Sequence, residues 1–287
     1  MRPAVSRPLL RDARREAVER LRAVSETPAL DADLLLCAAL GVERAFLLAH
    51  LDDPLAEAAA AQFEAWLARA AVGEPVAYIL GVRGFYDREF IVTPDVLIPR
   101  PETELLLEQA LAWAEDHPVR LAADIGTGSG ALAVTFAAHV PSAQVVAVDI
   151  SPAALAVAQA NTARHGVSER ITFLHGDLLA PLLERGLPPN LIMANLPYIP
   201  SSDLPALAVT GHEPSLALDG GPDGLDLVRR LLAQAVDLCQ PGALLLLEIG
   251  AGQGEAALAA VRAIWPAAEA AVLPDYAGHD RIVRVVV

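Results

Sequence analysis

The sequence is poor in the residues that build covalent or metal-bound frameworks. Two of its 287 residues are cysteines, Cys37 and Cys239, and both lie in apolar, helix-like stretches. A disulfide scaffold needs several cysteines at regular spacings, and a structural zinc site needs a cluster of cysteines and histidines. We therefore interpret both thiols as core residues and expect no metal site.

The chain also lacks any apolar run that approaches the roughly 20 residues of a membrane-spanning helix. Even the apolar stretch 256–272 is interrupted by Arg262, Pro266 and Glu269. The Arg-rich N-terminus is not followed by an apolar block or a cleavage site, so a signal peptide is not expected there. These absences predict a cytoplasmic protein with no membrane partner.

Positive charge is scarce as well. Lys and Arg number 21 against 36 Asp and Glu, which gives a formal net charge of −15 at pH 7. An acidic surface repels the phosphates of nucleic acids, so no direct nucleic-acid partner is expected. The charge is better suited to a basic protein partner or to a small neutral substrate.

Residues 1 to 80 contain helical patterns and no strand pattern. Apolar residues recur at helical spacing from Leu9 to Leu21. Asp31 is expected to cap a second helix, and Asp53-Pro54 to open a third. We predict a small helical domain, and the pattern leaves its role open between stability and recognition of a partner.

The pattern changes after this domain. The stretch 81–98 is rich in β-forming residues, with glycine and proline as breakers, and predicts a β-hairpin linker. From Leu121 onward, apolar strands alternate with helices, which predicts an α/β domain with a doubly wound, mostly parallel sheet. The two last strands, expected at 272–276 and 282–287, are joined by a short loop and should therefore pair antiparallel.

A glycine-rich loop follows the first strand of this α/β domain. It reads Gly126-Thr127-Gly128-Ser129-Gly130 and comes directly after Asp124-Ile125. Glycines let the backbone turn tightly and approach a ligand closely. Asp149 ends the second strand, where a carboxylate can accept both ribose hydroxyl protons, and Asp177 follows the third, where an acceptor can meet an adenine amino group. An adenosine-type ligand is predicted.

The loop alone does not name the cofactor. The pattern Gly126-x-Gly128-x-x-Ala131 also satisfies the dinucleotide fingerprint, with Asp149 about 20 residues further on. Asp124 favours S-adenosylmethionine, because it can help to bind the ammonium of a methionine moiety and would lie badly beside a pyrophosphate. No Gly-Lys-Ser/Thr of a P-loop occurs. The candidate cofactor contacts are Asp124, Gly126, Thr127, Gly128, Ser129, Gly130, Asp149, Ile150, Asp177, Leu178 and Asn195.

A polar turn, Asn195-Leu196-Pro197-Tyr198, ends another buried strand at 191–194. Ligands of parallel sheets bind at the carboxyl ends of the strands. The Asn side chain and a neighbouring backbone carbonyl can accept the protons of an NH2 group, while the Tyr ring stacks on its flat face. These four residues are the candidate catalytic and acceptor site, and a purely structural Asx-Pro turn is the alternative.

These motifs, in this order, resemble those of the protein N5-glutamine methyltransferases that modify peptide chain release factors. The resemblance covers most of the chain and includes the stretches 73–81, 97–104, 213–225 and 280–283. It implies a Rossmann-like class I methyltransferase domain at 99–287, a β-hairpin linker at 81–98 and a substrate-recognition domain at 1–80. S-adenosylmethionine would be the methyl donor, with S-adenosylhomocysteine as product. The implied acceptor is the glutamine of a Gly-Gly-Gln loop on the release factor, and we expect a monomeric enzyme.

Two positions depart from the family pattern. The usual signature is Asn-Pro-Pro-Tyr, whereas this chain has Leu196 in place of the first Pro, and Asn190 stands where the family usually has an acid. The backbone carbonyl at 196 is retained, so it can still accept an amide proton beside Asn195 Oδ1. Such positioning would align the amide nitrogen with the methyl group and compensate its developing charge. His212 and Glu213 are candidate proton acceptors.

Three alternative functions remain open from the sequence. A DNA adenine N6-methyltransferase shares the Asn-x-Pro-Tyr logic but needs a basic DNA-facing surface. A related family methylates a glutamine of a ribosomal protein, and the stretch 218–224 is more similar to the release-factor branch. Loss of activity through the Leu196 change would leave a module that only binds the cofactor.

Overall fold

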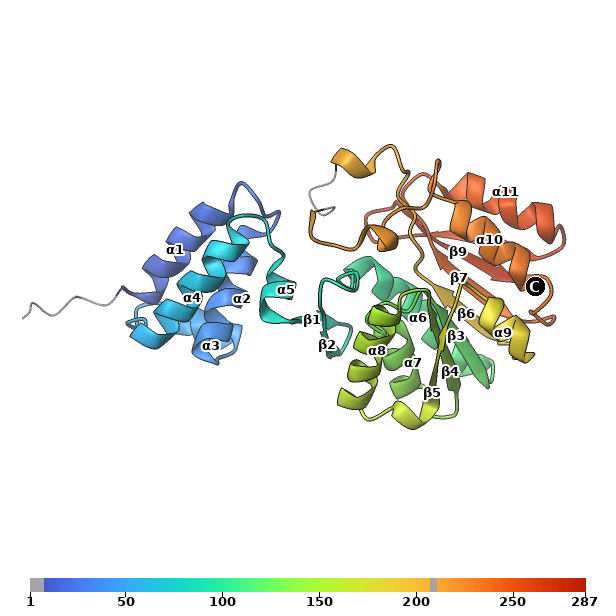
Figure 1. Cartoon of the computed structure of the whole chain (residues 1–287), viewed down its shortest axis with the longest axis horizontal. Helices are drawn as coiled ribbons and strands as arrows, with labels where there is room; N and C mark the ends of the chain where they lie inside the picture. The colour runs from blue at the N-terminus through green and yellow to red at the C-terminus, as the bar shows by residue number, and fades with distance from the viewer. Residues whose placement is uncertain (1–7, 207–210) are drawn as a thin grey trace, which may run out of the picture. The chain divides into compact units, whose positions relative to one another are not determined.

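The chain folds into two compact units, Met1–Gly81 and Val82–Val287, drawn in Figure 1. The computed structural model describes residues 8–206 and 211–287. We call the first the helical unit and the second the α/β unit. No helix in the described residues is long and apolar enough to cross a membrane.

The helical unit packs its helices around an apolar core. Its helices are α1 (Leu10–Leu21), α2 (Pro28–Leu40), α3 (Arg44–Ala49), α4 (Glu57–Ala70) and α5 (Val76–Leu80). Asp33 is fully buried and accepts hydrogen bonds from Arg14 Nε at 2.5 Å and Arg44 Nε at 2.9 Å. Two guanidinium groups thus compensate the one buried charge. The resulting ion pairs join α1, α2 and α3.

Two helices of this unit begin elsewhere than the sequence predicted. α2 starts at Pro28, because the fixed φ of proline suits the first helical turn, so Asp31 lies inside that turn and is not its cap. α4 starts only at Glu57, after Pro54 has formed an isolated β-bridge with Leu9. Tertiary pairing therefore outweighs the local Asp-Pro signal.

The α/β unit begins with a hairpin, β1 (Val82–Phe85) and β2 (Arg88–Ile91). The strands of its main sheet are β3 (Leu121–Ile125), β4 (Gln144–Asp149), β5 (Ile171–His175), β6 (Leu191–Ala194), β7 (Leu244–Glu248), β8 (Glu269–Pro274) and β9 (Asp280–Val286). Its α-helices are α6 (Pro101–Asp116), α7 (Ala131–His139), α8 (Pro152–Arg164), α9 (Ala180–Arg185), α10 (Asp226–Ala235) and α11 (Gly254–Ile264). Short 3-10 helices lie at Ser168–Arg170, Leu204–Ala206 and Ser215–Ala217.

The strand order of the main sheet is β5-β4-β3-β6-β7-β9-β8. All neighbours are parallel except β9, which runs antiparallel to both β7 and β8. The order reverses beside β3, which is where ligands of open α/β sheets bind. The predicted doubly wound, mostly parallel sheet with an antiparallel last strand is confirmed.

Helices cover both faces of this sheet, because its strands are apolar on both sides (Figure 1). On one face, α6 and α7 pack on alternate strand residues such as Ala122 and Met193. On the other, α9, α10 and α11 pack on Ile192, Leu245 and their neighbours. Residues of β3, β4 and β6 are in register, so the loops that follow these strands emerge at one edge.

Candidate functional site

A cavity of about 540 Å³ opens at this edge of the sheet. The glycine loop, the ends of β4 and β5, the turn after β6 and the start of α6 line it, together with residues 214–217. Every candidate cofactor residue named from the sequence lies at its wall except Gly130, which follows directly on the loop. A smaller cavity of about 140 Å³ adjoins it and is lined by Arg100 and the whole Asn195–Tyr198 turn.

The glycine loop depends on the absence of side chains. Gly126 and Gly130 have φ values of +74° and +81°, a region that side chains disfavour. A Cβ at Gly130 would lie 3.1 Å from Ala158 Cβ, so α7 and α8 could not approach so closely. A Cβ at Gly126 would lie 3.1 Å from Leu196 Cδ2, which places the two candidate halves of the site in direct contact.

Asp124 supports the loop from within the core. Its side chain is buried, and Oδ2 accepts hydrogen bonds from Thr127 Oγ1 at 2.7 Å and from the Ala133 amide at 3.0 Å. Burial raises its pKa to about 6, against the lowering effect of these bonds. Asp124 thus connects the start of the loop to α7. It supports ligand binding by fixing the shape of the loop.

Asp149 lies at the end of β4 and is held by backbone amides. Oδ2 accepts from Gly128 N and Oδ1 from Ser151 N, both at 2.9 Å. Burial raises its pKa, while the bonds from Ser151 and Gly128 oppose that rise. Each oxygen keeps free lone pairs, so the carboxylate can accept further hydrogen bonds from a diol. Beside it, the side chain of Ile150 is half exposed and offers an apolar surface to a flat ring.

Asp177 and Leu178 lie in the loop after β5. The Asp177 carboxylate forms an ion pair with Arg230 of α10, and both line the cavity. Leu178 has a φ of +52°, which is rare for a residue with a side chain, yet the side chain is buried in the core. This strained turn brings the backbone of the loop to the cavity wall.

Asn161 of α8 was not anticipated from the sequence. It is fully buried, and its Nδ2 donates to the carbonyl of Ser129 at 2.8 Å and to that of Ile91 at 2.9 Å. Its Oδ1 accepts from the Ile91 amide at 2.7 Å. One amide side chain thus connects the glycine loop to the hairpin strand β2.

Asn195 is positioned by residues that are distant in the sequence. Its Nδ2 donates to Thr103 Oγ1 at 2.8 Å, and Thr103 Oγ1 donates to Glu248 Oε2 at 2.7 Å. Thr103 lies in the first turn of α6 and Glu248 at the end of β7, and both are buried. The NH2 group of Asn195 is therefore engaged, and its carbonyl oxygen is the group left for a ligand. Sequence reasoning missed Thr103 and Glu248, because only the fold brings them to the turn.

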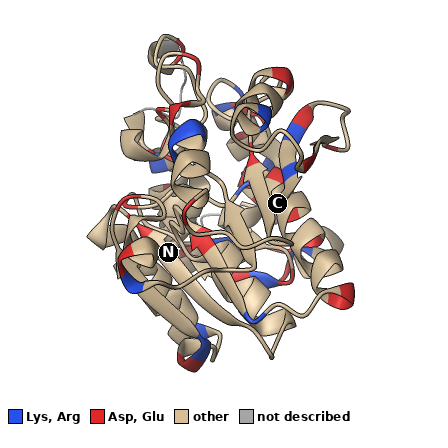
Figure 2. Ribbon diagram, turned by 90° about the vertical axis from the view of Figure 1, so that its right-hand side faces the viewer, with Lys and Arg blue, Asp and Glu red and all other residues tan. Residues whose placement is uncertain are grey.

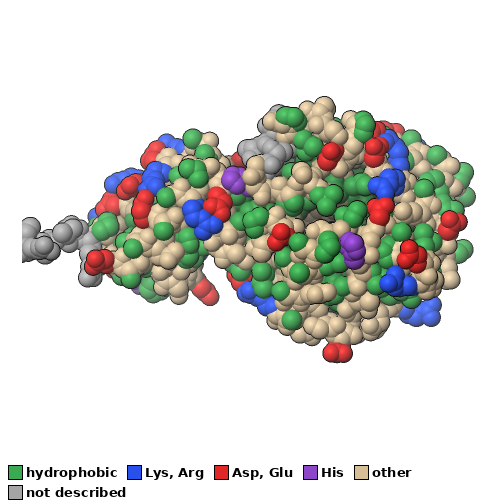
Figure 3. Space-filling model, in the orientation of Figure 1, with side chains coloured by type: hydrophobic (Ala, Val, Ile, Leu, Met, Phe, Trp, Pro, Cys, Tyr) green, Lys and Arg blue, Asp and Glu red, His purple; other side chains and the backbone are tan. Residues whose placement is uncertain are grey.

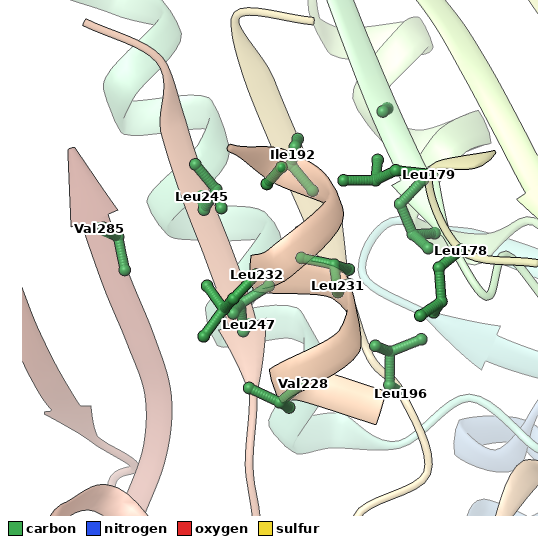
Figure 4. Close-up of a cluster of buried hydrophobic side chains, with 14 of the residues drawn as sticks. Leu178, Leu179, Ile192, Leu196, Val228, Leu231, Leu232, Leu245, Leu247 and Val285 are labelled. Atoms are coloured by element: carbon green, nitrogen blue, oxygen red, sulfur yellow. The ribbon is translucent and has the colours of Figure 1, made fainter. Parts of the chain in front are cut away.

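The other residues of the turn have distinct surroundings. Leu196, which replaces the family's usual Pro, is 4% exposed and joins the core beside Leu178 and Val228, as Figure 4 shows. The Tyr198 carbonyl accepts from Gln253 Nε2 at 2.8 Å. Burial, and secondly the negative charge of Glu248, raise the pKa of the Tyr198 hydroxyl to about 12. Tyr198 therefore stays neutral and is unsuited to act as a base.

Glu213, a candidate proton acceptor from the sequence, is occupied by structural contacts. It is buried and accepts from Arg100 Nη2 at 2.6 Å and from the Ile98 amide at 3.3 Å. These bonds join the segment before α6 to Glu213, which directly precedes the lining residues 214–217. His212 next to it is half-buried. Arg100, whose role was not foreseen, thus lines both cavities and is held by Glu213.

The donors and acceptors of the large cavity fit S-adenosylmethionine. The cavity wall offers the Asp149 carboxylate with free lone pairs, the apolar side chain of Ile150 and a glycine-rich loop, which are groups suited to a ribose, an adenine ring and a methionine chain. Residues 122–210 match the family model of a methyltransferase domain, and residues 12–81 match that of a PrmC N-terminal domain. The protein is therefore an S-adenosylmethionine-dependent methyltransferase.

Close relatives narrow this class to one family. The chain is 49% identical to the release factor glutamine methyltransferase of Moorella thermoacetica, over 95% of this chain and 96% of the relative. It is 47% identical to the enzyme of that name from Cereibacter sphaeroides, over 95% and 96% of the two chains. The chain belongs to the release factor glutamine methyltransferase family.

Among solved structures, the catalytic domain of hMettl16 in complex with the MAT2A 3′UTR hairpin 6 shares the fold. The TM-score is 0.53 at 15% identity, and the match covers 69% of this chain and 74% of the other. At this identity the likeness concerns the α/β fold alone. It agrees with the predicted Rossmann-like methyltransferase architecture.

Proposed function

We propose that this protein methylates the side-chain amide nitrogen (N5) of the glutamine in the Gly-Gly-Gln loop of peptide chain release factors. The observation that carries this proposal is the orientation of Asn195, whose NH2 group is engaged by Thr103 while its carbonyl oxygen remains for a ligand. A substrate amide presents two N–H donors, and the Leu196 carbonyl next to Asn195 offers the second acceptor.

In this proposal the chain works by positioning. Bound S-adenosylmethionine supplies an electrophilic methyl group. Asn195 Oδ1 and the Leu196 carbonyl hold the amide nitrogen of the substrate in line with it and compensate the positive charge that develops on that nitrogen. Pro197 keeps the turn stiff, and the ring of Tyr198 packs on the flat amide. No strong base is required for this alignment, in agreement with the neutral state of Tyr198.

The cofactor contacts follow from the geometry of the loop. Asp149 would accept the ribose hydroxyl protons, and Ile150 would contact the adenine ring. Asp177, paired with Arg230, would meet the adenine amino group together with the backbone of Leu178. The loop residues from Asp124 to Gly130 would enclose the methionine part.

We assign recognition of the release factor to the helical unit, residues 1 to 80, with the hairpin at 81–98 as the connection to the catalytic domain at 99–287. Large apolar side chains are exposed on the helical unit, among them Phe46 at 48% and Val72 at 77%. Figure 3 shows hydrophobic side chains at its surface between charged ones. Exposed aromatic side chains such as that of Phe46 belong to a residue type that is enriched at protein–protein interfaces.

Deletion of the helical unit tests this assignment. The variant that starts at Val82 should bind S-adenosylmethionine like the full chain, because every cofactor residue lies in the α/β unit. Its methylation of a folded release factor should be impaired, whereas a short Gly-Gly-Gln peptide serves as the control substrate. Equal rates on the folded factor with and without the unit would refute the assignment.

The proposed reaction is tested by mass spectrometry of purified release factor. Incubation with the enzyme and S-adenosylmethionine should add 14 Da, the mass of one methylene, to the peptide that contains the Gly-Gly-Gln loop. Omission of either component should abolish the change. Ribosomal proteins and an adenine-containing DNA duplex serve as parallel substrates, and methylation of one of these instead would replace the proposal. Figure 2 shows Arg interspersed with acidic residues along the ribbon. This mixture of charges disfavours DNA as the substrate, because DNA binding requires a basic surface.

We further propose that the enzyme acts in the cytoplasm as a monomer. Light scattering during gel filtration should give the mass of a single chain, 30.2 kDa. A dimer that dissociates with loss of activity would contradict this.

A further inference from the structure

A buried carboxylate lies behind the acceptor site without a role in the alignment described above. Glu248 is 1% exposed and accepts the hydroxyl proton of Thr103, which is 5% exposed and in turn accepts from Asn195. The second carboxylate oxygen, Oε1, has no hydrogen-bond partner among the described residues. Burying a carboxylate is costly, so its presence calls for a physical reason.

The direction of the hydrogen bonds supplies that reason. An ionised carboxylate can only accept, so Thr103 must direct its single proton to Glu248. The Thr103 oxygen then presents only lone pairs to the turn. Asn195 must therefore direct its NH2 group to Thr103, which leaves the amide oxygen for the cavity.

Protonation of Glu248 would reverse the direction of the hydrogen bonds that link Glu248, Thr103 and Asn195. A protonated carboxyl can donate to Thr103, whose own proton is then free to point at Asn195. The Asn195 amide would turn over to accept that proton and would present NH2 to the cavity. An NH2 group cannot accept a proton from a substrate amide, so this arrangement is unable to align the nucleophile.

We propose that Glu248 is a positioning residue whose negative charge, acting through Thr103, holds the Asn195 amide in the orientation that accepts a proton from the substrate amide. The inference rests on the proposed function for its effect on methyl transfer. The orientation of Asn195 is a property of the protein without its substrate and can be measured alone.

The surroundings of Glu248 bring the pKa of its carboxyl group close to neutral pH. Burial raises its pKa to about 7, Arg281 of β9 lowers it, and Glu102 of α6 raises it. Tyr198, in the turn after β6, also faces the carboxylate, and its hydroxyl favours the charged form. The reorientation of Asn195 is therefore expected as the pH falls below neutrality.

Nuclear magnetic resonance of the Asn195 side-chain NH2 group tests the orientation directly. The signals are assigned by their absence in Asn195→Asp. In the wild type they should move with a midpoint at about pH 7, the pKa of Glu248. The titration should vanish in Glu248→Gln and in Thr103→Val. The same midpoint in both variants would overturn the proposal.

Single-turnover methyl transfer to purified release factor tests the consequence. At saturating cofactor, Thr103→Val should slow the transfer on the order of 100-fold, the cost of a misplaced reacting group, whereas Thr103→Ser should stay near the wild type. Cofactor affinity is measured in both variants, so that the transfer rates are compared at full occupancy. Wild-type rates in Thr103→Val, or an equal loss in Thr103→Ser, would overturn the proposal.

A matched variant controls for the loss of a buried threonine. Thr135 of α7 is fully buried, lies outside both cavities, and its hydroxyl has no hydrogen-bond partner among the described residues. Thr135→Val should leave the rate unchanged. If the wild type methylates no release factor, the proposed function fails, and the resonance titration still decides the orientation of Asn195.

Discussion

The cofactor half and the acceptor half of the cavity are built over different distances along the chain. In the cofactor half, Thr127 bonds to Asp124 three residues before it, and Asp149 bonds to Ser151 two residues after it. The link from Gly128 to Asp149 spans 21 residues, that from Asn161 to Ser129 spans 32, and the ion pair of Asp177 with Arg230 spans 53. This half therefore combines local bonds with a few links of intermediate length.

The acceptor half depends on contacts between distant segments. Asn195 and Thr103 are 92 residues apart, and Thr103 and Glu248 are 145 apart. Arg100, which lines both cavities, and its partner Glu213 are 113 apart. Their positions follow only from the assembled sheet, so a change far from the turn in sequence can alter the chemistry.

The largest effect is expected from substitution of Leu196, where the cofactor half and the acceptor half meet. Its side chain is buried beside Leu178 and Val228 (Figure 4). Its Cδ2 atom lies where it would crowd a Cβ atom at Gly126. Leu196→Ala should leave a cavity and cost about 2–5 kcal/mol of unfolding free energy. Both cofactor affinity and transfer rate should fall, because the two halves meet here.

Urea unfolding of the α/β unit, followed by tryptophan fluorescence, measures this loss. Leu196→Pro is the informative comparison, since it restores the residue that the family usually has but removes the apolar contact. A stability of Leu196→Ala within experimental error of the wild type would show that the core contact is unimportant.

The next effect is expected at Asn195 and should separate the two halves. Asn195→Ala removes one acceptor of the substrate amide, and the single-turnover rate should fall on the order of 100-fold or more. Calorimetry shows whether Asn195 also contacts the cofactor, because cofactor affinity should change little only if that contact is minor. Asn195→Asp keeps an acceptor but cannot donate to Thr103, so we expect partial activity.

Asn190, at the other end of β6, is the matched control for this prediction. Its Oδ1 accepts from the Leu121 amide at 3.1 Å, and its Nδ2 donates to the Pro118 carbonyl at 2.8 Å, so its role is structural. Asn190→Ala should cost stability without the specific loss of rate. Near-wild-type transfer by Asn195→Ala would mean that the turn is structural as well.

Asp149 is the corresponding test of the cofactor half. Hydrogen bonds to a charged group are worth roughly 1.5–3 kcal/mol, so Asp149→Ala should weaken cofactor binding on the order of 10–100-fold. Asp149→Asn retains one acceptor and should lose less. Calorimetry that finds the wild-type affinity in both variants would exclude the ribose assignment.

The contrast also explains what the sequence could and could not predict. The alternation of strands and helices, and the turn after β6, were visible because each is a local pattern of apolar and breaker residues. The glycine loop and Asp149 were visible for the same reason. Their precise contacts were less so, since the bonds from Asp124 to Thr127 and Ala133, which fix the shape of the loop, were not anticipated.

Residues that act through long-range contacts carried no recognisable signal. Thr103 belongs to the stretch 97–104, which contributed to the family resemblance but indicated no role for this residue, and Glu248 is the one acidic residue at the end of an apolar strand. Asn161 is one polar residue in an alanine-rich helix. A buried polar residue at the end of a strand or inside an apolar helix is a sequence feature that merits a search for partners.

The last predicted effect concerns the pH dependence of stability and isolates the charge of Glu248. Its pKa is raised by burial from 4.5 to about 7 in the folded protein, so the folded state binds the proton more tightly than the unfolded chain. The wild type should therefore gain stability as the pH falls from about 7 to 5, with a slope of at most roughly 1.4 kcal/mol per pH unit from this group. Glu248→Gln lacks the titrating carboxyl and should lack this gain.

Urea unfolding of both proteins at pH 8, 7, 6 and 5 gives the unfolding free energy of each. The contributions of the other carboxyl groups cancel in the difference between wild type and variant. A difference that does not vary with pH would mean that Glu248 keeps one charge state throughout, and the acid-side reorientation of Asn195 would then have no cause.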